Sequence, residues 1–314
     1  MNTAIPEMPQ ERLSTQLLDQ TTLENEEEEA TGAGVSEGNE ARGPEQDSDE
    51  APPSDAQHEP ASLSHLCTEI HARVTAFLET PTTDEQVKQV QGQTRTTLDV
   101  IHDALRRYRL DELSLSYNGG KDCLVLLFLL LAALSTHKGA LPPRLQSVYI
   151  IPPSPFALVE SFVARSSDAY HLQVARYALP MRPAFGVYLH EHRQVKAIFV
   201  GTRRTDPHGA NLTHFDPTDH GWPSFMRIHP VIDWHYAEIW TFIRALKIPY
   251  CGLYDLGYTS LGGTNDTRPN PALRRDPDEL SGQGKGRGEQ GEDNTHGEHF
   301  RPAYELTEDH EERL

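Results

Sequence analysis

The chain has 314 residues, a formal net charge of −19 at pH 7 and 37% hydrophobic residues. Its first 60 residues contain 16 acidic residues and two arginines, a net charge of −14, which leaves −5 for residues 61–314. A mildly acidic body argues against nucleic acid as a partner, because nucleic-acid-binding proteins present a basic face. The apolar run Leu124–Leu134 is far shorter than the roughly 20 residues that span a membrane, so no membrane partner is expected.

Two regions of different composition are visible. Residues 1–60 lack aromatic residues and predict a disordered acidic tail, because they hold too little apolar surface to offset the entropy of ordering. Residues 61–314 are long enough for a single α/β domain, with a flexible Gly-rich, charged insertion expected at about 274–299. The three cysteines are widely spaced and no targeting segment is seen, which favours a cytoplasmic protein. We expect a monomer.

Strands and helices are predicted to alternate along this domain. Two amphipathic helices come first, at 64–78 and 94–107, followed by a short buried strand from Leu113 and a buried helix that runs to Leu134. Further strands are expected at 145–151, 171–177 and 197–201, and further helices at 156–166, 184–193 and from Tyr236. This alternation predicts a doubly wound, mostly parallel sheet of the Rossmann-like α/β class.

The first candidate site is the loop Ser116–Cys123, with the sequence SYNGGKDC, between that strand and that helix. Its two adjacent glycines let the backbone approach a ligand, and a helix start attracts anions through its N–H groups. Lys121 and Asp122 are not needed for a turn, and Ser116 and Asn118 add polar groups where parallel sheets bind ligands. A phosphate cradle is the leading interpretation. A plain strand-turn-helix is the alternative, and the spacing is not that of a P-loop triphosphatase.

Two more polar constellations follow. At the end of the strand near Val200, GTRRTDPHG places Arg203, Arg204 and Asp206 at the same edge of the sheet. Arginine forks suit phosphate, and Asp206 suits Mg²⁺ or a ribose hydroxyl. A surface loop with a local ion pair is the alternative. Farther on, Asp219 and Trp222 suit a flat aromatic ligand with a polar edge. An aromatic loop packed on the sheet is the alternative there.

These stretches carry a resemblance. SYNGGKDC resembles the pyrophosphatase loop of the adenylyl-transferring PP-loop proteins (the adenine nucleotide α-hydrolase type), in the form found in fungal-type FAD synthases of the PAPS-reductase-like family. Gly201, Arg203 and Asp206 resemble the G-x-R-x-x-D motif of that family. The stretch from Thr218 to Arg227 resembles its flavin-side motif T-D-x-x-W-P-x-F-x-R. The resemblance covers roughly residues 98–273 and 300–313.

The resemblance implies an FMN adenylyltransferase, a nucleotidyltransferase that makes FAD and pyrophosphate from ATP and FMN with Mg²⁺. The ATP-binding residues it implies are Ser116, Tyr117, Asn118, Gly119, Gly120, Lys121, Asp122, Gly201, Arg203 and Asp206. The FMN- or FAD-binding residues are Arg204, Asp219, Trp222 and Arg227, and the metal-binding residues are Asp122 and Asp206. Catalysis is assigned to Asn118, Asp122, Asp206 and Arg313.

Arg313 matches the first arginine of a terminal E-R-x-G-R motif, whose second arginine this sequence lacks. A sulfonucleotide reductase is one alternative function, but it needs a nucleophilic C-terminal cysteine, and the last cysteine here is Cys251. A degenerate nucleotide-binding interaction module is the other, and the intact Asn118, Asp122 and Arg203 argue against it. The histidines between 190 and 229 show no zinc-ligand spacing and are expected on the surface or in loops.

Overall fold

The structure is a computed structural model that describes residues 62–219, 221–275 and 300–313. The predicted acidic tail, and the predicted insertion except for its first two residues, lie outside the described residues. Residues 62–314 group into one compact unit of the chain. No helix among the described residues is long and apolar enough to cross a bilayer.

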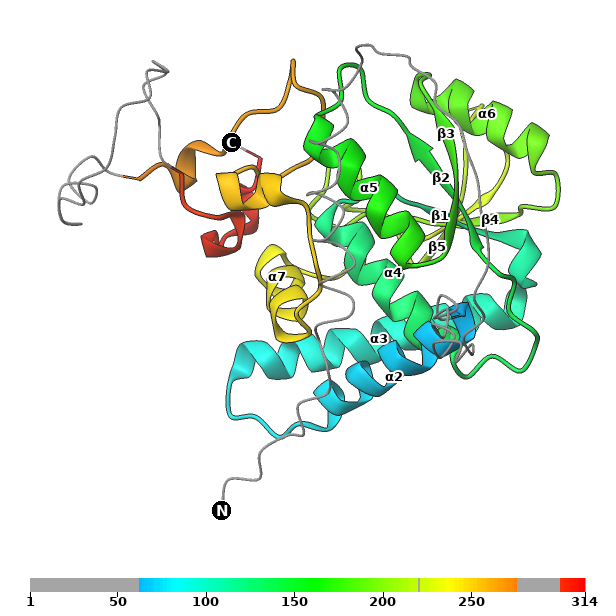
Figure 1. The fold of residues 1–314 in the computed structure, drawn as a ribbon, viewed down its shortest axis with the longest axis horizontal. Coiled ribbons are helices and arrows are strands. Elements are labelled where there is room, and N and C mark those ends of the chain that lie inside the picture. The colour runs from blue at the N-terminus through cyan, green and yellow to red at the C-terminus, as the bar shows by residue number, and fades with distance from the viewer. Residues whose placement is uncertain (1–61, 220, 276–299, 314) are drawn as a thin grey trace, which may run out of the picture. The chain divides into compact units, whose positions relative to one another are not determined.

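A six-stranded sheet forms the centre of this unit, in the order β3-β2-β1-β4-β6-β5 (Figure 1). Its strands are β1 (Leu113–Ser116), β2 (Leu145–Ile150), β3 (Leu172–Tyr177), β4 (Ala197–Phe199), β5 (Phe215–Pro217) and β6 (Met226–Ile228). All neighbouring pairs are parallel except β5 with β6. The predicted doubly wound, mostly parallel sheet is therefore confirmed.

The strand order explains where a site forms. From β1 the chain adds β2 and β3 on one side of the sheet and then returns to add β4 on the other side. The carboxyl ends of β1 and β4 are neighbours at this reversal, and parallel sheets bind ligands at such a point. The loop after Ser116 and the loop after Phe199 therefore leave the sheet side by side.

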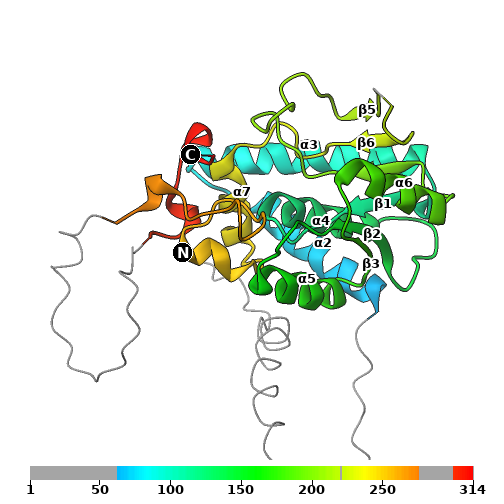
Figure 2. The same ribbon diagram turned by 90° about the horizontal axis from the view of Figure 1, so that it is seen from above.

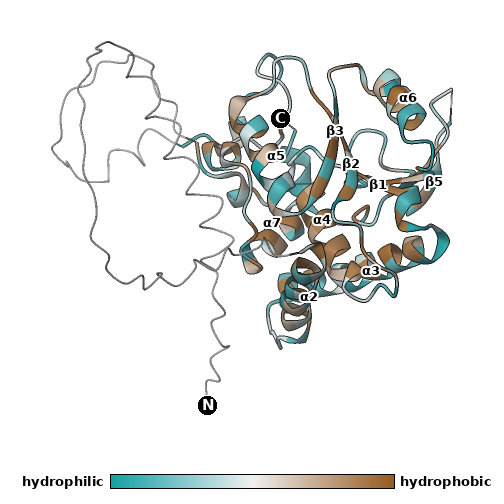
Figure 3. Cartoon of the chain, turned by 45° about the vertical axis from the view of Figure 1, so that its right-hand side comes forward, coloured by the Kyte–Doolittle hydropathy of each residue, from teal (hydrophilic) through white to brown (hydrophobic). Residues whose placement is uncertain are grey.

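The helices are α2 (Leu63–Glu79), α3 (Glu85–Arg107), α4 (Lys121–Leu134), α5 (Ala157–Ala169), α6 (Met181–Glu191) and α7 (Tyr236–Ala245). Helix α4 is buried from Leu124 to Leu134 because it lies between the sheet and helices α2, α3 and α7. It is coloured as hydrophobic where it is visible, whereas α2 and α3 carry alternating polar and apolar residues (Figure 3). Helix α6 packs on the sheet through a separate apolar cluster. It lies on the other side of the strands from α4 and α5 (Figure 2).

Two elements differ from the predictions. Helix α3 begins at Glu85, nine residues before the predicted start, because Asp84 caps it by accepting from the backbone N–H groups of Gln86 and Val87. The polar residues of its first turns hide the helical pattern in the sequence. Strands β5 and β6 were not predicted, since three-residue strands leave almost no periodic signal.

Candidate active site

The glycine-rich loop turns sharply between β1 and α4. Gly119 has a φ of +73°, and a Cβ atom there would lie 3.0 Å from side-chain atoms of Phe162 and Val163. Both facts restrict this position to glycine. The side-chain oxygen of Asn118 accepts a 2.9 Å hydrogen bond from the backbone N–H of Gly120. The Asn118 side chain therefore shapes the loop through its bond to the Gly120 backbone, and Asn118 remains exposed at the tip of the loop.

Some of the predicted ATP-binding groups are already engaged by the protein. The Tyr117 ring is fully buried and its hydroxyl donates to Ser166, so only the Tyr117 backbone faces the loop. The backbone N–H of Lys121 donates to the hydroxyl of Tyr254 at 2.9 Å. Ser116 is half-buried at the end of β1.

Lys121 is buried, with 2% of its surface exposed. Its ammonium group donates to Asp122 at 3.1 Å, to the Thr259 carbonyl at 3.3 Å and to Glu312 at 2.5 Å. These contacts use all three N–H donors of a lysine. The structure therefore directs the Lys121 side chain to protein oxygens, which differs from the predicted contact with ATP.

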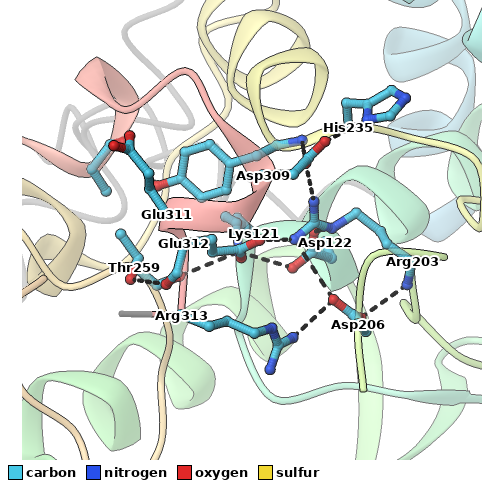
Figure 4. Close-up of polar contacts among 12 residues, drawn as sticks. Lys121, Asp122, Arg203, Asp206, His235, Thr259, Asp309, Glu311, Glu312 and Arg313 are labelled. Carbon is cyan, nitrogen blue, oxygen red and sulfur yellow. Dashed lines mark hydrogen bonds and ion pairs between the residues drawn. The ribbon is translucent and has the colours of Figure 1, made fainter. Parts of the chain in front are cut away.

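Arg203 is fully buried and lies at the centre of the cluster (Figure 4). Its Nε atom lies 2.7 Å from Oδ1 of Asp122, and its Nη1 atom lies 3.3 Å from Asp309. It also pairs with Glu312. The backbone N–H of Arg203 donates to Asp206 at 2.9 Å. The loops after β1 and β4 thus meet through side chains, as the sequence predicted for Asp122, Arg203 and Asp206.

The ionisation of this cluster is set by pairing. Burial alone would lower the pKa of Lys121, but the carboxylates of Asp122 and Glu312 outweigh it and raise that pKa above its usual value. The pKa of Arg203 is raised in the same way. Burial alone would raise the pKa of Asp122, but Lys121 and Arg203 hold it below its usual value. All three groups are therefore charged at neutral pH.

Asp206 and Arg313 form the outer part of the site. The Arg313 guanidinium lies 2.8 Å from Oδ1 of Asp206, and its side chain is 49% exposed. The four carboxylates of the cluster are Asp122, Asp206, Asp309 and Glu312, and its three cations are Lys121, Arg203 and Arg313. The cluster thus carries one excess negative charge. A polyphosphate placed here requires a counter-cation to offset repulsion.

The donor set is compatible with Mg²⁺. The described residues contain no group of three or more acidic, histidine or cysteine side chains arranged to hold a metal. Mg²⁺ in phosphate sites, however, takes only one or two protein carboxylates and fills its shell with phosphate and water. Oδ1 of Asp122 is buried without a well-aligned hydrogen bond, although Arg203 lies beside it. Asp122 and Asp206 therefore fit as the one or two carboxylates of such a shell.

Three of the four predicted flavin-binding residues, Asp219, Trp222 and Arg227, lie on β6 or in the segment just before it. Trp222 is 37% exposed and lies against Phe185 of α6, with ring centroids 6.5 Å apart. Arg227 lies on β6, and its Nε atom is buried without a hydrogen-bond partner. Asp219 is exposed in the turn before Trp222, whose backbone N–H donates to the Asp219 carbonyl. A partly exposed aromatic surface beside α6 results.

Arg204 lies elsewhere. Its guanidinium pairs with Asp233 at 2.7 Å and donates to the carbonyls of Ala210 and Leu212. These contacts hold Arg204 at Asp233 and the loop 210–212, which differs from the predicted role in flavin binding. His229 lies in the loop directly after β6, as expected for a surface or loop histidine, but it is only 1% exposed, because β6 carries its neighbour Ile228 into the core.

Sequence reasoning missed the acceptors that complete the cluster, Asp309 and Glu312, and the supporting residues Tyr254 and Thr259. The only local signal was the position of Glu312 next to Arg313 in the terminal motif. An ion pair between residues 191 positions apart leaves no other trace in one sequence.

The chain is similar to known proteins along most of the described region. The profile of the phosphoadenosine phosphosulfate reductase domain matches residues 179–269. A probable FAD synthase of Schizosaccharomyces pombe is 42% identical over 194 residues, which are 60% of this chain and 73% of that protein. A probable FAD synthase of Caenorhabditis elegans is 32% identical over 251 residues, 80% of this chain but 45% of that protein, so the chain spans under half of the nematode relative.

Among solved structures, the FMN adenylyltransferase of Candida glabrata in complex with FAD and inorganic pyrophosphate superimposes with a TM-score of 0.72 at 30% identity. The match covers 80% of this chain and 98% of the Candida protein.

Proposed function

This chain belongs to the FAD synthase family, and we propose how its site joins ATP and FMN into FAD and pyrophosphate. The observation that carries the proposal is the meeting of two loops at the carboxyl ends of β1 and β4. One loop supplies the glycine turn and Asp122, and the other supplies Arg203 and Asp206. A helix start, an arginine and two carboxylates at a topological switch point suit a nucleoside triphosphate with its metal.

The reaction is a nucleotidyl transfer. An oxygen of the FMN phosphate attacks the α-phosphorus of ATP, the bond from that phosphorus to the bridging oxygen breaks, and pyrophosphate leaves. A phosphate monoester is ionised near neutral pH, since its second pKa is about 6, so no general base is required. The chain must supply alignment and charge neutralisation instead.

The residues divide these tasks. The loop Asn118–Gly120 and the start of α4 face the ATP phosphates, and the half-exposed Arg313 neutralises them from the outer side. Asp122 and Asp206 would hold Mg²⁺, which when bound offsets the excess negative charge between the cluster and the triphosphate. Asp206 also keeps the loop after β4 in place through the backbone N–H of Arg203.

FMN is assigned to the surface beside α6. Trp222 offers a partly exposed ring for the flavin, and the unsatisfied Nε of Arg227 is a donor without an acceptor. Asp219 precedes Trp222 in the same turn and supplies a polar partner for the flavin edge. Arg204 is not used in this assignment, because Asp233 and two carbonyls occupy its guanidinium.

A reductase is disfavoured by the cysteines. Cys251 has no exposed surface, and burial raises the pKa of its thiol, whereas a nucleophilic cysteine must be accessible and ionised. We further propose a cytoplasmic monomer built from a single domain with an acidic tail and an insertion. The three free thiols are consistent with a reducing compartment.

Incubation of the chain with ATP, Mg²⁺ and FMN, followed by chromatographic separation of flavins, tests the function. The expected result is FAD with one pyrophosphate per FMN consumed. Riboflavin in place of FMN is the matched control, because it lacks the attacking phosphate and must give no product. Absence of FAD formation by the folded chain under saturating substrates contradicts the proposal.

A further inference from the structure

We propose that Glu312 is a positioning residue of this site: its buried carboxylate fastens the C-terminal segment to Lys121 and Arg203 and so holds Arg313 beside Asp206. The inference rests on the proposed function, because it assigns Arg313 to the ATP phosphates. It also gives Lys121 a different role from the predicted one, since the loop lysine then holds the protein together and does not contact the nucleotide.

The Glu312 carboxylate bridges two buried cations. One oxygen lies 2.5 Å from the Lys121 ammonium, and the other oxygen accepts from the Arg203 guanidinium (Figure 4). The Glu312 side chain is 4% exposed and the two cations are 3% and 0% exposed. A carboxylate this deep is stable only with its charges paired, so the segment that carries it is held firmly.

The neighbouring residues are fastened as well. The hydroxyl of Thr259 donates to the Glu312 carbonyl at 2.7 Å, and the amide of Asn270 donates to the Glu311 carbonyl at 2.7 Å. Asp309 accepts from the backbone N–H of Tyr236 at 2.6 Å and pairs with His235. Residues 309–312 are thus tied at both ends to the body of the domain.

Arg313 follows this anchor directly and differs from it in exposure. Its side chain is 49% exposed, and its guanidinium pairs with Asp206, which is itself 17% exposed. An arginine that comes one residue after a buried anchor loses little freedom when it meets a phosphate, because its backbone is already placed. The contacts of Glu312 therefore lower the entropy that Arg313 loses when it binds a phosphate.

Lys121 serves the anchor and not the ligand. Its three donors reach Asp122, the Thr259 carbonyl and Glu312, and the ring of Tyr236 closes the remaining side at 5.1 Å. No N–H of the ammonium is left for a phosphate oxygen. The same contacts would also serve an opposite role for Glu312, as a carboxylate that occupies the cations until phosphates displace it. The two roles predict opposite effects on ATP binding.

The test is Glu312→Gln, with Glu308→Gln as the matched control, because Glu308 is exposed in the same segment. Hydrogen exchange of the C-terminal peptide is measured without substrates, and KM for ATP and kcat are measured with FMN saturating. Faster exchange and a KM raised about tenfold or more are expected for Glu312→Gln, with the control unchanged. Tighter ATP binding, or unchanged exchange, overturns the proposal.

A double variant tests whether Glu312 acts through Arg313. If it does, Glu312→Gln combined with Arg313→Ala should match Arg313→Ala alone within about twofold, because the anchor has nothing left to position. If the activity loss of the double variant equals the product of the two single-variant losses, Glu312 acts through general structure and the proposal is overturned. Should Glu312→Gln fail to fold, Thr259→Val leaves both ion pairs of Glu312 in place and removes the hydrogen bond to the Glu312 carbonyl, together with the bond that the Thr259 hydroxyl accepts from Asn270. It is expected to shift exchange and KM in the same direction, by less. The exchange measurement needs no turnover, so it separates failure of this inference from failure of the proposed function.

Discussion

Gly201 and Cys123 meet where the loop after β4 passes the first turn of α4. A Cβ atom at residue 201 would lie 3.0 Å from the backbone nitrogen of Cys123 and 3.1 Å from its sulfur atom. This close approach carries the next residues of the loop to α4, so that Arg203 reaches Asp122. The site therefore depends on the absence of a side chain at one position.

Gly201→Ala should lower kcat/KM by about tenfold or more, because the added methyl group pushes the loop away from α4 and misplaces Arg203. Overpacking at such a contact costs about 1–3 kcal/mol of unfolding free energy. Steady-state kinetics and urea unfolding measure the two effects. Full activity in this variant would mean that the two loops can separate without loss of the site.

Gly92→Ala is the matched control for that variant. Gly92 is exposed within α3, and nothing lies within 4 Å of a Cβ atom placed there. Alanine is a better helix former than glycine, so the unfolding free energy should rise by about 0.5–1 kcal/mol. Activity should stay at the level of the original chain, and a loss would show that α3 communicates with the site.

Asp122→Asn should reduce turnover at least a hundredfold, since it removes a carboxylate that faces Arg203 and is assigned to the metal. The fold should survive with a loss of up to about 3 kcal/mol, because Glu312 still pairs with Lys121 and Arg203, and Asp206 and Asp309 also face Arg203. Circular dichroism and FAD formation measure the two outcomes. Leu126→Asp is the contrast: it buries a charge in the centre of α4 and should abolish folding.

The three thiols should react slowly with a maleimide at pH 8 in the folded chain. Burial raises the pKa of Cys67 to about 12 and that of Cys123 to about 12, and it raises the pKa of Cys251 as well. The thiolate is the reactive form, so little of it is present. In guanidinium chloride three equivalents should react at once. Fast labelling of Cys67 or Cys251, the two buried thiols, in the native chain would contradict this prediction.

Stability should fall as the pH drops below about 6.5. Burial lowers the pKa of His229 below its usual value, against the raising effects of its contact with the Thr213 carbonyl and of Asp216. The unfolded state then binds the proton more readily, so this contribution is complete above the unfolded pKa and is lost as the pH falls through the folded one. Urea unfolding at pH 7.5 and pH 5.5 measures the difference, and His229→Gln should reduce it. If the difference in unfolding free energy between the two pH values is unchanged in His229→Gln, other groups such as His102 cause the loss of stability.

The sequence by itself determined the parts of this protein that depend on neighbours along the chain. The apolar run from Leu124 to Leu134 predicted a buried helix, and the two glycines before it predicted a tight loop. The order of strands and helices fixed a parallel sheet with a switch point. That order predicted that the loops carrying Asp122, Arg203 and Asp206 share one edge of the sheet, and the structure brings these side chains together there.

Only the tertiary structure decided which charges pair. The position of Lys121 in the loop suggested a contact with phosphate, but its ammonium group donates to Thr259 and Glu312, which lie far along the chain. Arg204 turns to Asp233 although its neighbour Arg203 turns inward. His229 is buried because a strand too short to predict carries it there. The physical reason is common to all three: ion pairing and burial depend on segments brought together by folding, and no local periodicity encodes them.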